Sequence, residues 1–154
     1  MKFFTTAAIL GVASARFSKG ACPKVEYMDK IEKSKYTGKW YETYRDNWNI
    51  FTIGAECVTK EYALDENEDI DLYFRGNYLV AGYQGVDGKL SGCGDHGKST
   101  CYATMHNHHW GKWKELIPFN VLDTDYENYE VYYDCHNILF GLFKWTDFAV
   151  YSRS

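Results

Sequence analysis

The sequence predicts an all-β domain, an eight-stranded antiparallel up-and-down β-barrel, and three observations carry that prediction. The 154 residues include 14 Tyr, 9 Phe and 5 Trp but only 2 Pro, and aromatic side chains favour the half-buried surface of a pleated sheet. Seven to eight short segments alternate apolar and polar residues, with turn residues between them. Apolar residues do not recur at helical spacing for three turns. Closing such strands into a barrel removes the sheet edges and leaves room for one small ligand.

The expected strands are defined by this alternation and follow one another in hairpin order. In the third of them, Ile70, Leu72 and Phe74 share one face, while Asp71 and Arg75 lie on the other. The Asp87-Gly88 pair in VDGK predicts a tight turn. The full set of expected strands is 39–45, 55–64, 70–76, 90–94, 99–105, 119–126, 128–135 and 143–153.

The first fifteen residues have the pattern of a secretory signal peptide. Lys2 precedes the apolar run FFTTAAILGVA, and the run ends at Ala13-Ser14-Ala15, a small-x-small cleavage pattern. The apolar run is too short to span a bilayer. A buried N-terminal helix is the alternative, but no polar face alternates with the apolar one. We therefore expect a signal peptide at 1–15 and a secreted barrel domain at 16–154.

Charge and motif content argue against several other classes of protein. The formal net charge is −4 without a block of like charges, so we expect no nucleic-acid partner. His106, His108 and His109 are clustered, but neighbouring side chains on a strand point to opposite faces and no spaced carboxylate or cysteine completes a ligand set. We expect no metal and no cofactor. No nucleophile–base set or carboxylate pair stands out, so we expect a protein that is not an enzyme.

Three separated motifs resemble those of the lipocalin family, in particular its apolipoprotein D, bilin-binding and retinol-binding branch. They are Gly38-x-Trp40 on the first expected strand, Thr124-Asp125-Tyr126 near the seventh, and Arg153 at the end of the last. The resemblance implies that Trp40 packs across the closed end of the barrel, with Arg153 over its ring, and that Gly38 lets the chain turn into the strand. These residues define the scaffold and leave the ligand open.

The same resemblance implies a disulfide between Cys22 and Cys135. In the family, the cysteine equivalent to Cys57 pairs with one beyond a C-terminal helix, and this sequence ends one residue after Arg153. Two explanations stay open, namely a truncated sequence that lacks this helix or a protein with an unpaired thiol. An unpaired Cys57 makes a disulfide-linked dimer the alternative to a monomer.

Cys93 and Cys101 fall outside the family pattern. They lie symmetrically about Gly97 in an expected hairpin, so they can face each other across adjacent strands and form a local disulfide. The alternative, in which Cys57 pairs with one of them, stays open.

Strand alternation also predicts which side chains line the interior. On the seventh strand we expect Glu130, Tyr132 and Asp134 to face water. A bulge in any strand would reverse its assignment, and a barrel filled by its own side chains is the alternative to an open pocket. The predicted ligand-binding wall is Val58, Lys60, Tyr62, Ile70, Leu72, Phe74, Val131, Tyr133, Ala149 and Tyr151.

We expect a secreted carrier of a small hydrophobic ligand, such as a fatty acid, sterol, retinoid or bilin. Lys60 would be costly inside the barrel without a partner, and a ligand carboxylate would supply one, which ranks fatty acids slightly first. The alternative is that its ammonium reaches water at the mouth. Trp48 and Phe51 lie on an unusually apolar loop and form either a rim at the mouth or core beneath it. A transient contact with a membrane or a receptor is left open as a further partner.

Two other functions stay open beside the carrier. One is an isomerase of the kind that uses a free cysteine inside a lipocalin barrel, for which Cys57 would have to face inward. The other is a pigment-carrying or protein-binding lipocalin.

Overall fold

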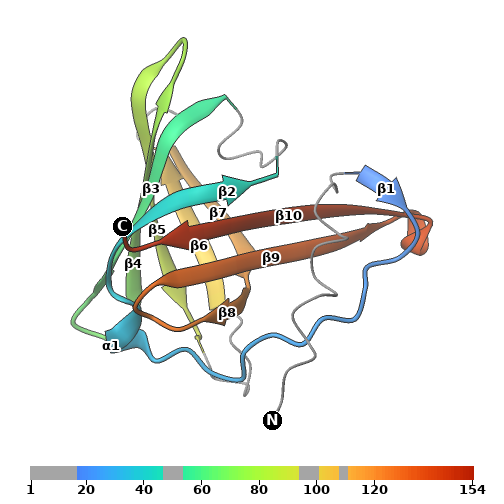
Figure 1. The fold of residues 1–154 in the computed structure, drawn as a ribbon, viewed down its shortest axis with the longest axis horizontal. Helices are drawn as coiled ribbons and strands as arrows, with labels where there is room; N and C mark the ends of the chain where they lie inside the picture. Colours follow the sequence, from blue (N-terminus) through green and yellow to red (C-terminus); the bar gives the residue numbers. More distant parts are fainter. Residues whose placement is uncertain (1–16, 47–53, 94–100, 108–110) are drawn as a thin grey trace.

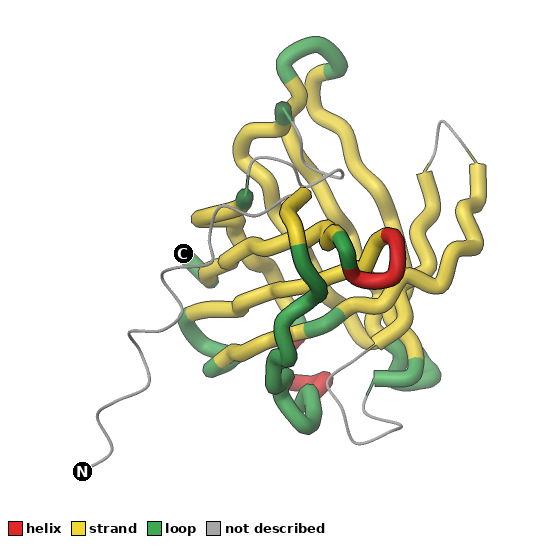
Figure 2. The backbone as a smooth tube through the Cα atoms, turned by 90° about the vertical axis from the view of Figure 1, so that its right-hand side faces the viewer, coloured by secondary structure: helices red, strands yellow, loops and turns green. Residues whose placement is uncertain are grey.

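The computed structural model describes residues 17–46, 54–93, 101–107 and 111–154, and for residues 106, 107 and 111–118 it describes the backbone alone. Within these ranges the chain is almost entirely strand, and all strand pairs are antiparallel (Figures 1 and 2). None of the helices in the described ranges is long and apolar enough to cross a lipid bilayer. The elements are β1 (Phe17–Lys19), α1 (Lys33–Tyr36), β2 (Gly38–Arg45), β3 (Ala55–Leu64), β4 (Ile70–Tyr78), β5 (Gly82–Ser91), β6 (Cys101–Asn107), β7 (Gly111–Phe119), β8 (Val121–Thr124), β9 (Tyr129–Ile138), η1 (Leu139–Gly141) and β10 (Phe143–Ser152).

The strands follow the path β7-β6-β5-β4-β3-β2-β10-β9-β8, which curls around a common interior. Asn120 alone separates β7 from β8. Since β7 pairs with β6 and β8 pairs with β9, these two segments together take the place of one wall strand. Counted in this way the wall has eight antiparallel strands, which confirms the predicted fold class. β1 lies off this path and pairs with β10.

One end of the barrel, which we call the closed end, is marked by α1. Lys33 Nζ donates to the Glu68 carbonyl at 2.8 Å, which ties α1 to the turn between β3 and β4. The Glu32 amide donates to the Tyr126 hydroxyl at 3.0 Å, which ties the same segment to the loop before β9. The turn at 79–81 and the η1 turn therefore lie at the opposite end, which we call the far end (Figure 1).

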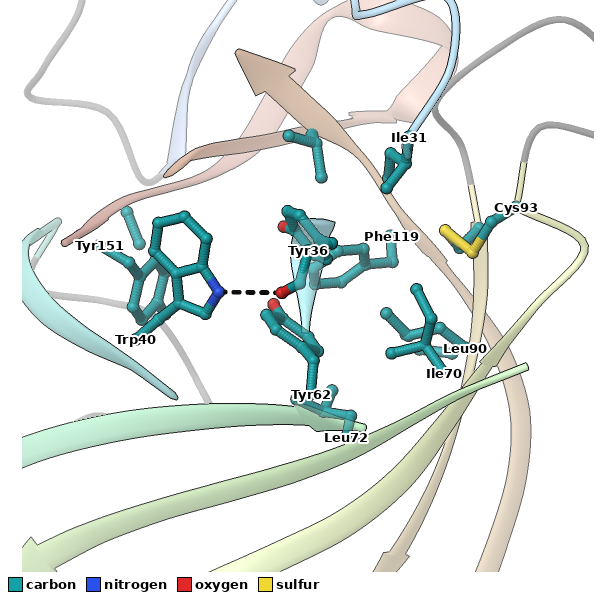
Figure 3. Close-up of a cluster of buried hydrophobic side chains, with 14 residues drawn as sticks. Ile31, Tyr36, Trp40, Tyr62, Ile70, Leu72, Leu90, Cys93, Phe119 and Tyr151 are labelled. Atoms are coloured by element: carbon teal, nitrogen blue, oxygen red, sulfur yellow. Dashed lines mark hydrogen bonds between the residues drawn. A yellow bond between two sulfur atoms is a disulfide. The ribbon is translucent and has the colours of Figure 1, made fainter. Parts of the chain in front are cut away.

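The main core lies near the closed end and is built largely from aromatic rings (Figure 3). The rings of Tyr36 and Tyr62 lie 4.7 Å apart between centroids, and Tyr36 and Trp40 lie 5.9 Å apart. A second and smaller apolar cluster contains Ala55, Val58 and Phe74. The main core consists of Ile31, Tyr36, Trp40, Tyr62, Ile70, Leu72, Leu90, Cys93, Cys101, Ala103, Phe119, Val121, Ala149 and Tyr151.

Two disulfides are present, and both predicted pairings are confirmed. Cys22–Cys135 joins the segment before α1 to β9 across 113 residues. Cys93–Cys101 closes a short loop between β5 and β6. Cross-linking a loop of about 100 residues removes chain entropy worth roughly 4–5 kcal/mol from the unfolded state in the loop-closure model. The longer bridge therefore contributes more to stability than the shorter one.

The predicted turn at Asp87-Gly88 is wrong, because both residues lie inside β5. A Cβ atom at Gly88 would lie 2.8 Å from Met105 Sδ and 2.9 Å from the Thr104 carbonyl oxygen. Gly88 is therefore explained by the close approach of β6 to β5 and not by a turn conformation.

Candidate ligand site inside the barrel

The floor of the barrel is built around Trp40, which is fully buried on β2. The guanidinium carbon of Arg153 lies 3.7 Å from the centre of the Trp40 ring, and the indole Nε1 donates to the Tyr36 carbonyl at 3.1 Å. Arg153 also donates to the carbonyls of Thr37 at 2.8 Å and Tyr126 at 3.1 Å. This is the arrangement that the resemblance implies. It locks the last strand and the α1 segment onto the first strand of the wall.

Gly38 is required by two independent features of this floor. Its φ of +98° lies in the region that side-chain-bearing residues rarely adopt. A Cβ atom there would also lie 2.9 Å from Arg153 Nη1. The glycine therefore leaves the space in which the guanidinium reaches the tryptophan.

The Thr124-Asp125-Tyr126 motif holds the loop that meets Arg153. The Asp125 carboxylate accepts amide hydrogen bonds from Asn128 at 2.7 Å and Tyr129 at 3.0 Å. The Thr124 hydroxyl accepts from the Tyr126 amide at 3.0 Å. Hydrogen bonds from the Asn128 side chain and from these amides lower the pKa of Asp125 to about 2. The carboxyl group is therefore ionised at physiological pH and orders the loop as a fixed acceptor.

Above the floor, the interior contains a buried ion pair between Lys60 on β3 and Glu130 on β9. Lys60 Nζ lies 3.2 Å from Glu130 Oε1, and the two side chains are 4% and 0% exposed. The Tyr62 hydroxyl lies 3.4 Å from both carboxylate oxygens. The alternation of β3 places Lys60 and Tyr62 on the same inner face. The interior is therefore charged and hydrogen-bonded at this level, and Lys60 points inward as predicted but is paired with a protein carboxylate.

Aromatic rings complete the surroundings of the Lys60 ammonium. Its Nζ lies 3.5 Å from the centre of the Tyr151 ring and 5.2 Å from those of Phe119 and Tyr132. Burial lowers the pKa of Lys60, while Glu130 opposes that shift. Ring faces and a carboxylate together replace the water that the ammonium loses on burial.

A second ion pair lies on β2, between Glu42 and Arg45. Arg45 Nη1 donates to Glu42 at 2.7 Å, the Tyr151 hydroxyl donates to the same carboxylate at 3.2 Å, and Arg45 Nη2 donates to the Ala55 carbonyl. The two residues face the same side because Tyr151 pairs with Glu42 and Ala149 with Arg45, which leaves one extra residue in β2 at this point. Burial raises the pKa of Glu42, and Arg45 opposes the shift.

The predicted orientation of β9 is wrong. Glu130 and Tyr132 contact the buried lysine, and Asp134 is also buried, so these three side chains do not face water. Alternation then places Val131 and Tyr133 on the other face of the strand. Hydropathy favours the opposite assignment, but an ammonium buried without a counter-ion costs several kcal/mol. That cost outweighs the gain from turning Val131 and Tyr133 inward, and Tyr133 is buried on the other face as well.

The rest of the predicted wall is buried as expected, but it divides into two groups. Tyr62, Ile70, Leu72, Ala149 and Tyr151 belong to the main core at the closed end. Val58 and Phe74 form the separate cluster nearer the far end. The closed end is thus filled by the protein's own side chains. The region between the ion pairs and the far end is therefore the candidate ligand site.

Sequence reasoning missed Glu42 and Glu130 as interior residues. Glu42 lies two positions after Trp40 on the same strand, so the period of two was an available signal for an inward side chain. Glu130 had only an indirect signal, the need of Lys60 for a counter-ion. Trp48 and Phe51 lie outside the described residues, as do the side chains of His106, His108 and His109.

Cys57 is exposed and unpaired in the structure. It lies at the irregularity in the β3–β4 register, with a φ of +52°. The isomerase alternative requires this thiol inside the barrel, and its position on the surface does not provide that.

We predict that Cys57 drives disulfide-linked dimers of the purified protein under oxidising conditions, because an exposed thiol is open to oxidation. A dimer band should be visible on non-reducing gels and disappear with a reductant. Cys57→Ser should remove it, and Cys57→Ser should leave the melting temperature unchanged. Dimers that persist in Cys57→Ser would show that one of the two intrachain bridges exchanges instead.

Comparisons with known proteins agree with this geometry. No family model matches the chain. The chain is 30% identical over 138 residues to the bilin-binding protein of Pieris brassicae, covering 88% of this chain and 69% of that protein. It is 28% identical over 135 residues to apolipoprotein D of Bos taurus, covering 86% and 67%. The solved structure of insecticyanin from the tobacco hornworm Manduca sexta superposes with a TM-score of 0.70 at 21% identity, covering 92% and 73%.

An eight-stranded antiparallel wall closed by a tryptophan–arginine floor defines a class of small β-barrel binding proteins. With the relatives above, this chain belongs to the lipocalin family. The chain spans about two thirds of the length of the curated relatives it matches.

Proposed function

We propose that the protein is an exported carrier that holds a small, uncharged apolar ligand between the ion pairs and the far end of the barrel. Two relatives support a binding role in general, since one is named for binding a bilin and another for binding retinol. Two disulfides support export, because such bonds persist in oxidising compartments. We therefore infer cleavage of residues 1–15 and secretion of the remaining domain.

The observation that carries the choice of ligand is the internal pairing of charge. Lys60 pairs with Glu130 and Arg45 pairs with Glu42, so these four groups cancel one another. A charged ligand beside them would lose its hydration and would find no free counter-ion among them, so its desolvation would not be compensated. The apolar cluster of Ala55, Val58 and Phe74 offers burial to a neutral molecule instead.

The expectation that fatty acids are preferred loses its basis. It rested on a Lys60 ammonium without a protein partner, and Glu130 is that partner. The alternative in which the ammonium reaches water is also excluded, because Lys60 is buried. Sterols, retinoids and other neutral molecules of similar size now rank above anionic lipids.

The test is a titration of the delipidated protein with a fluorescent fatty acid and with its alcohol analogue. We expect the alcohol to bind at least as tightly as the acid. Phe74→Asp should lower the affinity for the alcohol at least tenfold, because it puts a carboxylate into the apolar cluster. Tyr73→Asp, on the outer face of the same strand, is the matched control and should leave this affinity unchanged. A clear preference for the acid would contradict the neutral ligand, and binding of neither probe would contradict the carrier itself.

A further inference from the structure

Seven of the large apolar residues that are exposed in the described part of the chain gather at two turns of the far end. Leu79 and Val80 are 95% and 97% exposed at the 79–81 turn, with Tyr83 beside them. The η1 turn exposes Leu139, Phe140 and Leu142, and Phe17 lies next to it on β1. We call these two segments the rim turns. In Figure 1 they are the projecting corners of the molecule on the side away from α1.

Neither rim turn carries a charged residue. The sequence is uncharged from 76 to 86 around the first turn and from 137 to 143 around the second. Exposed turns are normally polar, so two uncharged apolar turns at one end of a small domain require an explanation. Polar-aromatic side chains stand behind the tips, since Tyr78 and Tyr83 flank the first turn. Lys19 and Lys144 follow the second, where β1 pairs with β10.

We propose that the rim turns insert into the interfacial layer of a phospholipid membrane, so that the far end of the barrel rests against the bilayer. Aliphatic tips backed by tyrosine and then by lysine match the gradient from acyl chains to head groups. A stable protein interface needs a continuous surface of about 1,000 Å² or more, whereas two separate narrow turns present isolated side chains. A lipid layer accepts such side chains without a matching shape.

Contact between the far end and a membrane is an additional property beyond the proposed carrier function, and it is compatible with that function. A ligand that leaves the bilayer through the far end reaches the barrel without its apolar surface crossing water, which avoids the main cost of transfer. The floor around Trp40 and Arg153 then faces away from the membrane. The contact has to be reversible, because a handful of apolar side chains binds far more weakly than a spanning segment.

The experiment is flotation of the full chain with phosphatidylcholine vesicles, with Leu79→Ser/Val80→Ser and Leu139→Ser/Phe140→Ser as variants. We expect the wild-type protein to float with the vesicles, and each double variant to partition at least tenfold more weakly. Leu64→Ser is the matched control, because Leu64 is an exposed leucine at the closed end and should have no effect. Raising the salt concentration should change wild-type binding less than twofold, because the contact is apolar.

The outcomes separate this proposal from the carrier function. Alcohol-probe affinity measured without vesicles should stay within twofold of wild type in both rim variants. Wild-type protein that stays with the soluble fraction, or rim variants that float as the wild type does, would overturn membrane insertion while leaving ligand binding intact. Self-association that the rim variants abolish, in the absence of vesicle binding, would assign the turns to a protein partner and overturn it as well.

Discussion

Glu130→Leu is expected to lower the free energy of unfolding by about 3–5 kcal/mol, because it leaves the Lys60 ammonium buried without its counter-ion. For a domain of this size that loss corresponds to a melting temperature lower by roughly 10 °C. Lys60→Met should produce a loss in the same direction, since it leaves the carboxylate alone. Urea unfolding monitored by tryptophan fluorescence measures both.

The decisive variant is the double replacement Lys60→Met/Glu130→Leu. Two apolar side chains of similar volume should recover most of the loss, because replacing both partners of a buried pair is often neutral or stabilising. Glu61→Leu, at an exposed position of the same strand as Lys60, is the matched control and should shift stability by less than about 0.5 kcal/mol. Single variants that add up to the effect of the double variant would show that the two charges do not interact.

Arg153→Leu is expected to lower the free energy of unfolding by about 2–4 kcal/mol. The change removes the stacking of the guanidinium on Trp40 and leaves the carbonyls of Thr37, Lys35 and Tyr126 without their donor. Affinity for an alcohol probe should change little, because the floor lies below the ion pairs. Thermal unfolding and probe titration of the same preparation measure the two effects separately.

Arg153→Lys tests whether the planar group or the charge matters at the floor. A lysine keeps the charge but loses the forked donors, so it should recover less than half of the lost stability. An Arg153→Leu variant with unchanged melting and abolished ligand binding would place the ligand at the closed end and contradict the orientation of the site.

Local patterns were enough to predict the barrel and its floor, because both depend on features that the sequence carries in one place. Period-two alternation fixed the inner face of β3 and β10, where Tyr62 and Ala149 are buried as expected. Arg153 is distant in sequence from Gly38 and Trp40, but all three lie in motifs whose geometry the resemblance supplies. The Cys22–Cys135 bridge was predictable for the same reason.

The interior ion pairs were not predictable in this way, because the inward position of at least one member of each pair depends on how separate strands pair. Glu130 lies 70 residues from Lys60, and hydropathy alone assigns a glutamate between Tyr129 and Val131 to water. Alternation from Trp40 indicates Glu42, but Arg45 shares its side only because of the irregular register between β2 and β10, which no local pattern in β2 indicates. Long-range pairing thus decided the chemistry of the site, while local alternation decided its architecture.

The pairing of β2 with β10 also has a kinetic consequence. The wall closes only when the first wall strand meets the last, and Tyr41 pairs with Ser152 across most of the described chain. Closing such a long loop lowers the chain entropy before the new contacts compensate for it. Barrels with this topology therefore fold in milliseconds to seconds and not in microseconds. Until β10 arrives, β2 has an unpaired edge beside an exposed aromatic core. A chaperone that covers this edge would therefore act on the stage of folding most prone to aggregation.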